Sequence, residues 1–332
     1  MKKCKISRSS GVGGQAVIEG VMMRHKDTYA VAVRKPDGEI EVETEEFEGV
    51  LHHNKIKTVP FIRGVFNFLD SLILGMKTLT FSSTFYIEEE EKETKTDKLF
   101  EKLFKDKAQN VLMGITMAIS IIMAVAIFMV LPYFLSSLFE KYVRNDSLLA
   151  ILEGVIRIMI FIVYIVAISA MKDIRRVYQY HGAEHKCINC IEKGRPLTVK
   201  NVMRSSKQHK RCGTSFMLFV MVVSIVLFFF IRVDQPALRV LLRILLIPVI
   251  AGISYEIIRL AGKSDNILVQ IISAPGMWLQ RLTTKEPDES MVEVAIASVE
   301  AVFDWKAYLK DTFGYEVDDS WMDDSKAQTG EE

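Results

Sequence analysis

The chain has 332 residues, half of them hydrophobic, yet a quarter of its residues are charged. Such a composition indicates apolar residues gathered into blocks, which is typical of a membrane protein with sizeable water-facing parts. The formal net charge of +1, from 42 basic and 41 acidic residues, excludes a polycation that coats nucleic acid. Four cysteines do not make a secreted disulfide scaffold. The basic first 15 residues lack an apolar run, so we expect no cleavable signal peptide.

Residues 1–108 are expected to form a cytoplasmic N-terminal region of mixed α and β structure. Period-two alternation around a Pro-Asp-Gly turn predicts a β-hairpin over 27–46. The apolar residues of 61–79 recur at helical spacing, with charged and polar residues opposite. This pattern predicts an amphipathic helix that lies along the membrane surface. The Glu- and Lys-rich stretch 88–107 predicts a solvated linker.

Four apolar stretches approach the length of about 20 residues that a helix needs to cross a bilayer. The first and third contain no charged residue, and the second contains Glu153 and Arg157 four residues apart. We expect these two, with Arg243 of the fourth stretch, to hold the helices together rather than to react. The four stretches are 111–138, 148–171, 215–231 and 237–260.

The charges of the connecting loops predict the orientation. The segment 172–211 holds eleven Lys and Arg against three acids, whereas the other two connections are short and nearly balanced. Because positive loops stay on the cytoplasmic side, this loop and both termini are expected there. Membrane topology alone accounts for the positive charge, so no nucleic-acid partner is implied.

Residues 263–332 are expected to follow the last span on the cytoplasmic side. The apolar segment 267–282 predicts an interfacial helix, and the spacing over 289–310 predicts an amphipathic docking helix. The acidic tail 318–332 is predicted to be disordered. The fold class is therefore a mainly α-helical integral membrane protein, whose transmembrane domain, 109–262, carries a cytoplasmic loop at 172–214.

The chemistry-bearing residues lie in that loop. His181, Glu184 and His185 form H-x-x-E-H, the reversed form of a zinc-protease signature. On a helix these positions share one face, so both histidines can hold one metal while Glu184 acts as base toward a bound water. His209 and Cys212 close the same loop, and imidazole and thiolate are ligands that suit zinc. Cytoplasmic thiols stay reduced, so a disulfide is the weaker explanation for the cysteines.

Three interpretations of the loop remain open. One is an open catalytic site with His181, His185 and one or both of His209 and Cys212 as ligands. The second is a closed zinc knuckle, in which Cys187-x-x-Cys190 joins His209-x-x-Cys212. The third is polar packing without a metal. The shared face of the H-x-x-E-H motif favours the open site.

Two further segments are candidates for the site. Glu256 is predicted to emerge from the fourth span at the same membrane face, and a salt bridge to Arg259 or to an arginine of the basic loop is its plain alternative. The glycine-rich run 11–20 fits no phosphate-binding loop and is interpreted as a turn that allows close backbone approach.

Four motifs together resemble the YqhQ-like family of bacterial membrane proteins: GGQAVIEGVMMR (13–24), YHGAEHK (180–186), RCGTSF (211–216) and PGMWLQRLTTKEP (275–287). The resemblance spans nearly the whole chain and implies a bacterial cell membrane and a metal-dependent enzyme. It also implies that the polar motif residues are His181, Glu184, His185, His209 and Cys212, with Cys187 and Cys190 outside the family pattern.

Together the residues predict a metal-dependent hydrolase at the cytoplasmic face of the membrane, with Glu184 as general base and a membrane-borne substrate. The expected cofactor is a divalent transition metal, with zinc the favoured ion. The alternative is a non-enzymatic assembly factor or partner subunit of a membrane machine, in which any metal is structural. The lipid bilayer is the expected environment, and a membrane-protein partner or a homo-oligomer is compatible with both. A transporter is disfavoured, because four spans without a repeat give little material for alternating access.

Overall fold

The computed structural model describes residues 8–50, 59–86, 108–231, 233, 235–261 and 266–314. The predicted charged linker (88–107) and acidic tail (318–332) lie outside the described residues. The chain divides into two compact units, each assembled from separate segments. Unit 1 comprises 1–86, 165–220 and 248–332, and unit 2 comprises 87–164 and 221–247.

Unit 1 contains a four-stranded antiparallel sheet in the order β1-β2-β3-β4. The predicted hairpin is confirmed, because β3 and β4 pair around the expected turn. The interpretation of 11–20 as a turn was wrong: most of this run is the edge strand β1, which pairs with β2. Glycine is poor at forming strands, so its abundance hid the strand in the sequence. The strands are β1 Val12–Val17, β2 Gly20–His25, β3 Thr28–Arg34 and β4 Ile40–Glu46.

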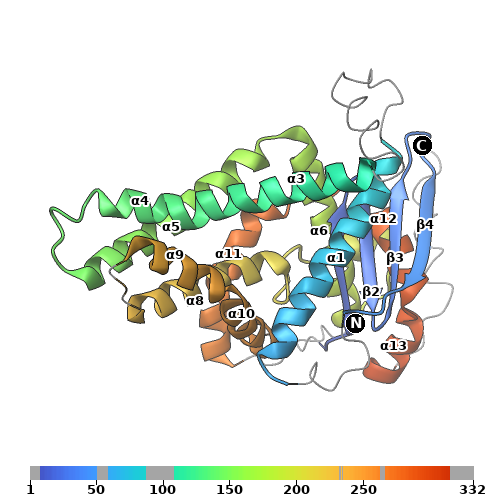
Figure 1. The fold of residues 1–332 in the computed structure, drawn as a ribbon. Coiled ribbons are helices and arrows are strands. Elements are labelled where there is room, and N and C mark those ends of the chain that lie inside the picture. Colours follow the sequence, from blue (N-terminus) through green and yellow to red (C-terminus); the bar gives the residue numbers. More distant parts are fainter. Residues whose placement is uncertain are drawn as a thin grey trace. The chain divides into compact units, whose positions relative to one another are not determined.

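Helices cover both faces of this sheet (Figure 1). Helix α1, Ile62–Thr84, lies on one face, where Leu74 packs with side chains of β1, β2 and β3. Helices α6, Lys172–Glu192, and α12, Glu289–Val302, pack on the other face in a continuous apolar core. Unit 1 also includes all or part of α7 Val199–Met203, α8 Gly213–Phe230, α10 Ile247–Ala261, α11 Ile267–Thr283 and α13 Trp305–Phe313.

The first three predicted spans are helices long and apolar enough to cross a membrane: Gly114–Ser137, Ser147–Ser169 and Gly213–Phe230. The first consists of α3 Ala108–Val125, a π-helical turn Ala126–Val130 and α4 Leu131–Ser137, and the second is α5 Asp146–Ser169.

The fourth predicted span, 237–260, is not one continuous helix. It is divided at Leu246 into α9, Pro236–Leu245, and α10, Ile247–Ala261. Pro248 explains the break, because proline lacks the N–H that would continue the hydrogen-bonding ladder. Neither piece reaches the length of a span by itself.

A buried ion cluster links three helices within unit 2. The carboxylate of Glu153 accepts a hydrogen bond from Arg157 at 2.7 Å and another from Arg243 at 2.7 Å. Arg157 also donates to the hydroxyl of Ser224 at 3.0 Å. All of these contacts join side chains to one another, as expected of groups that hold helices together.

Candidate metal centre

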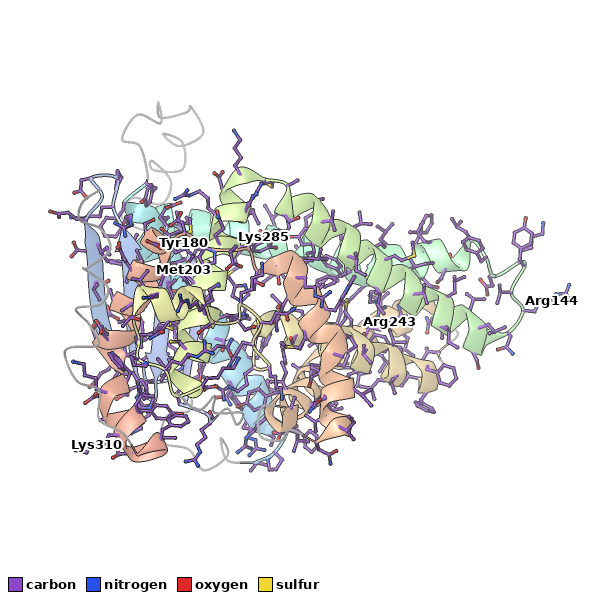
Figure 2. All side chains as sticks on the ribbon, turned by 180° about the vertical axis from the view of Figure 1, so that it is seen from behind. Arg144, Tyr180, Met203, Arg243, Lys285 and Lys310 are labelled. Carbon is purple, nitrogen blue, oxygen red and sulfur yellow. The ribbon has the colours of Figure 1, made fainter. Side chains whose placement is uncertain are left out.

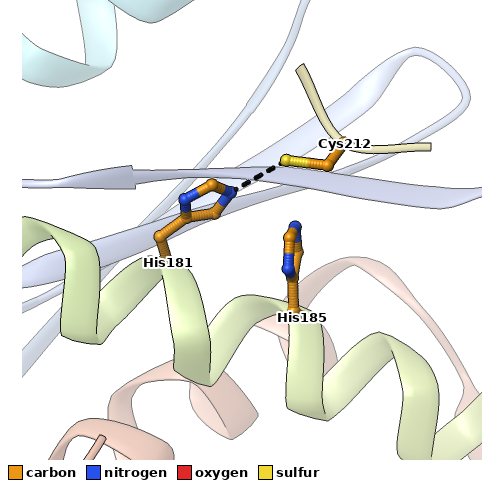
Figure 3. A group of neighbouring side chains, drawn as sticks. All are labelled: His181, His185 and Cys212. Atoms are coloured by element: carbon orange, nitrogen blue, oxygen red, sulfur yellow. Dashed lines mark hydrogen bonds between the residues drawn. The ribbon is translucent and has the colours of Figure 1, made fainter. Parts of the chain in front are cut away.

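Helix α6 presents the H-x-x-E-H side chains on one face, because residues three and four apart are neighbours on a helix. The ligand atoms of His181, His185 and Cys212 all lie within 4.8 Å of one another. Both imidazoles extend from α6, and Cys212 lies just before α8 (Figure 3). The Nε2 atom of His181 is 3.2 Å from the sulfur of Cys212.

Backbone carbonyls orient both imidazoles. Nδ1 of His181 is 3.0 Å from the carbonyl oxygen of Thr283, and Nδ1 of His185 is 2.7 Å from that of Lys207. A carbonyl oxygen only accepts, so in both hydrogen bonds Nδ1 is the donor. Each neutral ring therefore keeps a lone pair on Nε2, the atom that faces the other ligand atoms. Histidines that bind metals are commonly oriented in this way.

The carboxylate of Glu184 faces the same point. Its Oε2 atom is 3.8 Å from Nε2 of His181 and 3.7 Å from Nε2 of His185. Burial raises the pKa of Glu184 to about 7, an increase that only a protonated His181 would oppose. This pKa allows the carboxyl group to take up and release a proton near neutral pH.

Gly14 of β1 allows the strand to approach this carboxylate. A Cβ atom at Gly14 would lie 2.8 Å from Cγ of Glu184 and 2.7 Å from the carbonyl oxygen of Met22. Both distances are shorter than a normal van der Waals contact. Strand β1 therefore packs closely against Glu184, and this contact requires glycine at position 14.

Polar residues of α6 hold the loop that follows α7. Lys186 donates to the carbonyl oxygen of Ser205 at 3.1 Å, and Asn189 donates to that of Ser206 at 2.7 Å. With His185 and Lys207, these bonds give the loop several attachments to one face of α6. The loop carries the chain from α7 to His209 and Cys212.

A second attachment lies around Gly182. A Cβ atom there would be 2.1 Å from the carbonyl oxygen of Lys285, so only glycine permits this packing. The N–H of Lys285 donates to the carbonyl oxygen of Tyr178 at 2.8 Å. Figure 2 shows Lys285 near Tyr180 of α6. The same segment supplies the Thr283 carbonyl that orients His181.

His209 is near the group but is not brought into it. Its ring lies 5.7 Å from that of His185, and its Nε2 atom is 3.5 Å from Glu192. Gln280 holds the backbone of His209 by accepting from its N–H at 2.9 Å and donating to its carbonyl oxygen at 2.7 Å. Burial alone would raise the pKa of Glu192, but the hydrogen bond from His209 and the charge of Arg211 lower it to about 2. The imidazole of His209 is thus engaged by a carboxylate.

Cys187, Cys190 and Glu256 are placed elsewhere. Cys187 and Cys190 are buried in the apolar core of unit 1, and the thiol of Cys190 donates to the carbonyl oxygen of Pro196 at 3.4 Å. The described residues therefore do not assemble the closed four-ligand knuckle. Glu256 accepts a hydrogen bond from Nε of Arg63 at 2.6 Å, which pairs α10 with α1.

The group opens onto a cavity of about 800 Å³. Its lining includes the candidate ligands, residues 11–16 of the β1 segment, and apolar side chains of α1, α8 and α10, among them Phe68, Phe216 and Ile258. The candidate centre is therefore next to space that can receive a substrate.

Sequence reasoning did not identify the groups that support the centre. Gly182 carried a signal, because a glycine inside a helix has an unfavourable propensity and indicates close packing. Gly14 lies in the run interpreted as a turn that allows close backbone approach. The sequence did not indicate that Glu184 is the residue approached. The carbonyls of Thr283 and Lys207 carried no signal, because any residue supplies a backbone carbonyl.

Comparison with known proteins agrees with the motif resemblance. A family described as "Protein of unknown function (DUF1385)" matches residues 59–305. The "Uncharacterized protein YqhQ" of Bacillus subtilis (strain 168) is 37% identical over 292 residues, which cover 86% of this chain and 90% of that protein. No solved structure matches the chain.

Proposed function

The chain belongs to the YqhQ-like family of bacterial proteins, and we propose that it is a metal-dependent hydrolase. One observation carries the proposal. Two imidazoles, fixed by carbonyls so that their Nε2 lone pairs converge, meet a thiol, and a buried carboxylate lies within 4 Å of both rings. Polar packing alone does not explain why three donor atoms and a carboxylate face one point.

The donor set fits zinc. His181, His185 and Cys212 would hold the ion, because imidazole nitrogen and thiolate sulfur are both zinc ligands and three protein ligands leave the fourth tetrahedral position open. A bound zinc ion supplies Lewis-acid activation of water and of the group under attack. Glu184 takes a proton from the attacking water and delivers it to the leaving group. The test is the variant Glu184→Gln, which should keep the metal and lose turnover; normal turnover would overturn the proposal.

The substrate is membrane-borne in this proposal. Cys212 directly precedes the apolar helix α8, a candidate membrane span, so one ligand lies at the start of that span. The cavity beside the ligands is also lined by Phe216 of the same helix. A substrate that reaches this cavity from the bilayer is therefore favoured over a freely soluble one.

We also propose four crossings of a bacterial cell membrane, with both termini cytoplasmic. Strands of the N-terminal sheet, α6 and α12 share one apolar core, which requires them to lie on the same side. Two spans separate the sheet from α6, so an even number must separate α6 from α12. Helix α8 is one of these, and α9 with α10 supplies the other. The combined length of helices of 10 and 15 residues is about 37 Å at roughly 1.5 Å per residue, which exceeds a core of about 30 Å.

Cysteine labelling in intact cells tests this topology. Gln235→Cys, before α9, should react with a membrane-impermeant maleimide added outside. Asp37→Cys, in the β3–β4 turn, and Asp311→Cys, in α13, should react only after the cells are opened. The unsubstituted chain gives the background from its own cysteines. Reaction of Asp311→Cys in intact cells would contradict the fourth crossing, and reaction of Asp37→Cys would reverse the orientation.

A further inference from the structure

We propose that the substrate is an extended peptide segment that binds by adding a strand to the outer edge of β1. This inference rests on the proposed hydrolase function and names its substrate class. It begins from the position of β1, which is an edge strand of the sheet and pairs with β2. An open strand edge is a ready template for an extended peptide.

The register determines which backbone groups of β1 face outward. Val17 and Gly20 close a two-residue turn, and hydrogen-bonded pairs alternate along an antiparallel ladder. The N–H and C=O groups of Val12, Gly14 and Ala16 therefore point away from β2. The N–H of Val12 is taken by the hydroxyl of Ser10 at 3.2 Å, which agrees with this direction. Among the described residues, the outward groups of Gly14 and Ala16 have no hydrogen-bond partner.

This edge opens onto the cavity at the candidate centre. Gly13 and Gly14 are exposed, and both line the cavity together with Glu184 and Ala16. Glycine has no side chain to keep a second backbone away. Paired strands lie about 4.8 Å apart. Because Gly14 packs against Glu184, a peptide paired with Gly14 would bring a peptide bond beside that carboxylate.

The cavity also indicates the side chains of the peptide. Apolar residues of α1, α8 and α10 line it, which suits a peptide with apolar side chains. Arg24, Lys26 and Arg211 also line it, and among the described residues Glu184 is its single acid. This charge favours a peptide that carries an acidic residue. A lipid would use the apolar and basic groups but would leave the strand edge unpaired.

The reaction of such a peptide consumes one water molecule. The water oxygen forms a bond to the carbonyl carbon, and the carbon–nitrogen bond breaks. Glu184 transfers one proton from the water to the leaving nitrogen. The products are a carboxylic acid and an amine, and transfer of the second water proton from the acid to the amine gives a carboxylate and an ammonium group.

Binding of two synthetic peptides tests the proposal without turnover. The full chain, in detergent and in the Glu184→Gln background, is titrated with a fluorescent ten-residue peptide of alternating Val and Thr with one Asp. The second peptide is identical but N-methylated at alternate residues, which removes the N–H groups along one edge. Fluorescence anisotropy is measured after chelation and again with zinc, so binding is separated from the metal.

Two proline variants form the matched pair. Ala16→Pro removes an outward N–H from β1, and Thr44→Pro removes one from β4 at the opposite edge of the sheet. Proline is tolerated where the N–H faces away from the sheet. We expect Ala16→Pro to weaken peptide binding at least tenfold, the effect of losing one hydrogen bond of about 1.4 kcal/mol. Thr44→Pro should bind as the parent does.

N-methylation at the paired edge should weaken binding at least tenfold, with or without zinc. Equal binding of both peptides would overturn strand addition. Binding of phosphatidylglycerol vesicles by a chain that binds neither peptide would overturn it as well. If Ala16→Pro does not fold, the comparison of the two peptides still tests strand addition. If the peptide binds but the chain takes up no zinc when zinc is supplied, strand addition is supported and the hydrolase function is contradicted. Failure of strand addition and failure of the hydrolase function are therefore distinguishable.

Discussion

Replacing Glu184 with Gln is expected to lower turnover by about 10²–10⁴-fold, the usual contribution of a general acid or base. The amide keeps the size of the side chain but cannot accept a proton from water. Because the three donor atoms of the centre belong to other residues, the metal content should not change. Turnover is measured on zinc-loaded protein with a panel of quenched fluorescent peptides and labelled phospholipids.

The matched control is Glu293→Gln on α12. Glu293 is half-exposed and pairs with Arg34, and it is not part of the candidate centre. The turnover of the Glu293→Gln variant should therefore equal that of the wild type. A Glu184→Gln variant that keeps both its zinc and its turnover would show that this carboxylate is not the base. Loss of zinc in that variant would instead show that Glu184 is a ligand, which also contradicts the assignment.

Replacing Gly182 with Ala is expected to destabilise unit 1 and to weaken metal binding. The added Cβ would lie 2.1 Å from the carbonyl oxygen of Lys285, so the segment after α11 must move away from α6. Overpacking of this kind costs about 1–3 kcal/mol. Thr283, the last residue of α11, lies two residues before Lys285 and supplies the carbonyl that orients His181. Losing such support lowers metal affinity about 10–100-fold.

Gly213→Ala is the control for this substitution. Gly213 follows Cys212 directly, yet a Cβ atom there would meet nothing within 4 Å. Thermal unfolding in detergent and competition with a zinc chelator measure the two effects. Equal zinc affinity for both variants would contradict the role assigned to the Gly182 packing.

The sequence predicted the parts that depend on local pattern. Three uncharged or nearly uncharged apolar runs are helices of spanning length, and the H-x-x-E-H spacing lies on one face of α6. The fourth span was predicted as one helix because its hydropathy is continuous, but Pro248 divides it.

The parts that depend on distant contacts were not predictable in the same way. Spacing placed His209 with the ligands, but Glu192, seventeen residues earlier in the sequence, engages its imidazole. The β1 segment forms a strand because it pairs with β2 and packs closely against Glu184. A glycine-rich run in the sequence indicates neither contact. Helix packing and the supporting carbonyls are properties of the assembled fold.

The metal content of the purified protein tests the central claim most directly. Elemental analysis is applied to the wild type, to the double variant His181→Ala/His185→Ala, and to His25→Ala, whose ring packs on Phe303 and is not one of the candidate ligands. We predict about one equivalent of zinc per chain in the wild type and in His25→Ala, and none in the double variant. Absence of metal from all three, even after incubation with zinc, manganese and iron, would contradict the metal centre and the hydrolase function built on it.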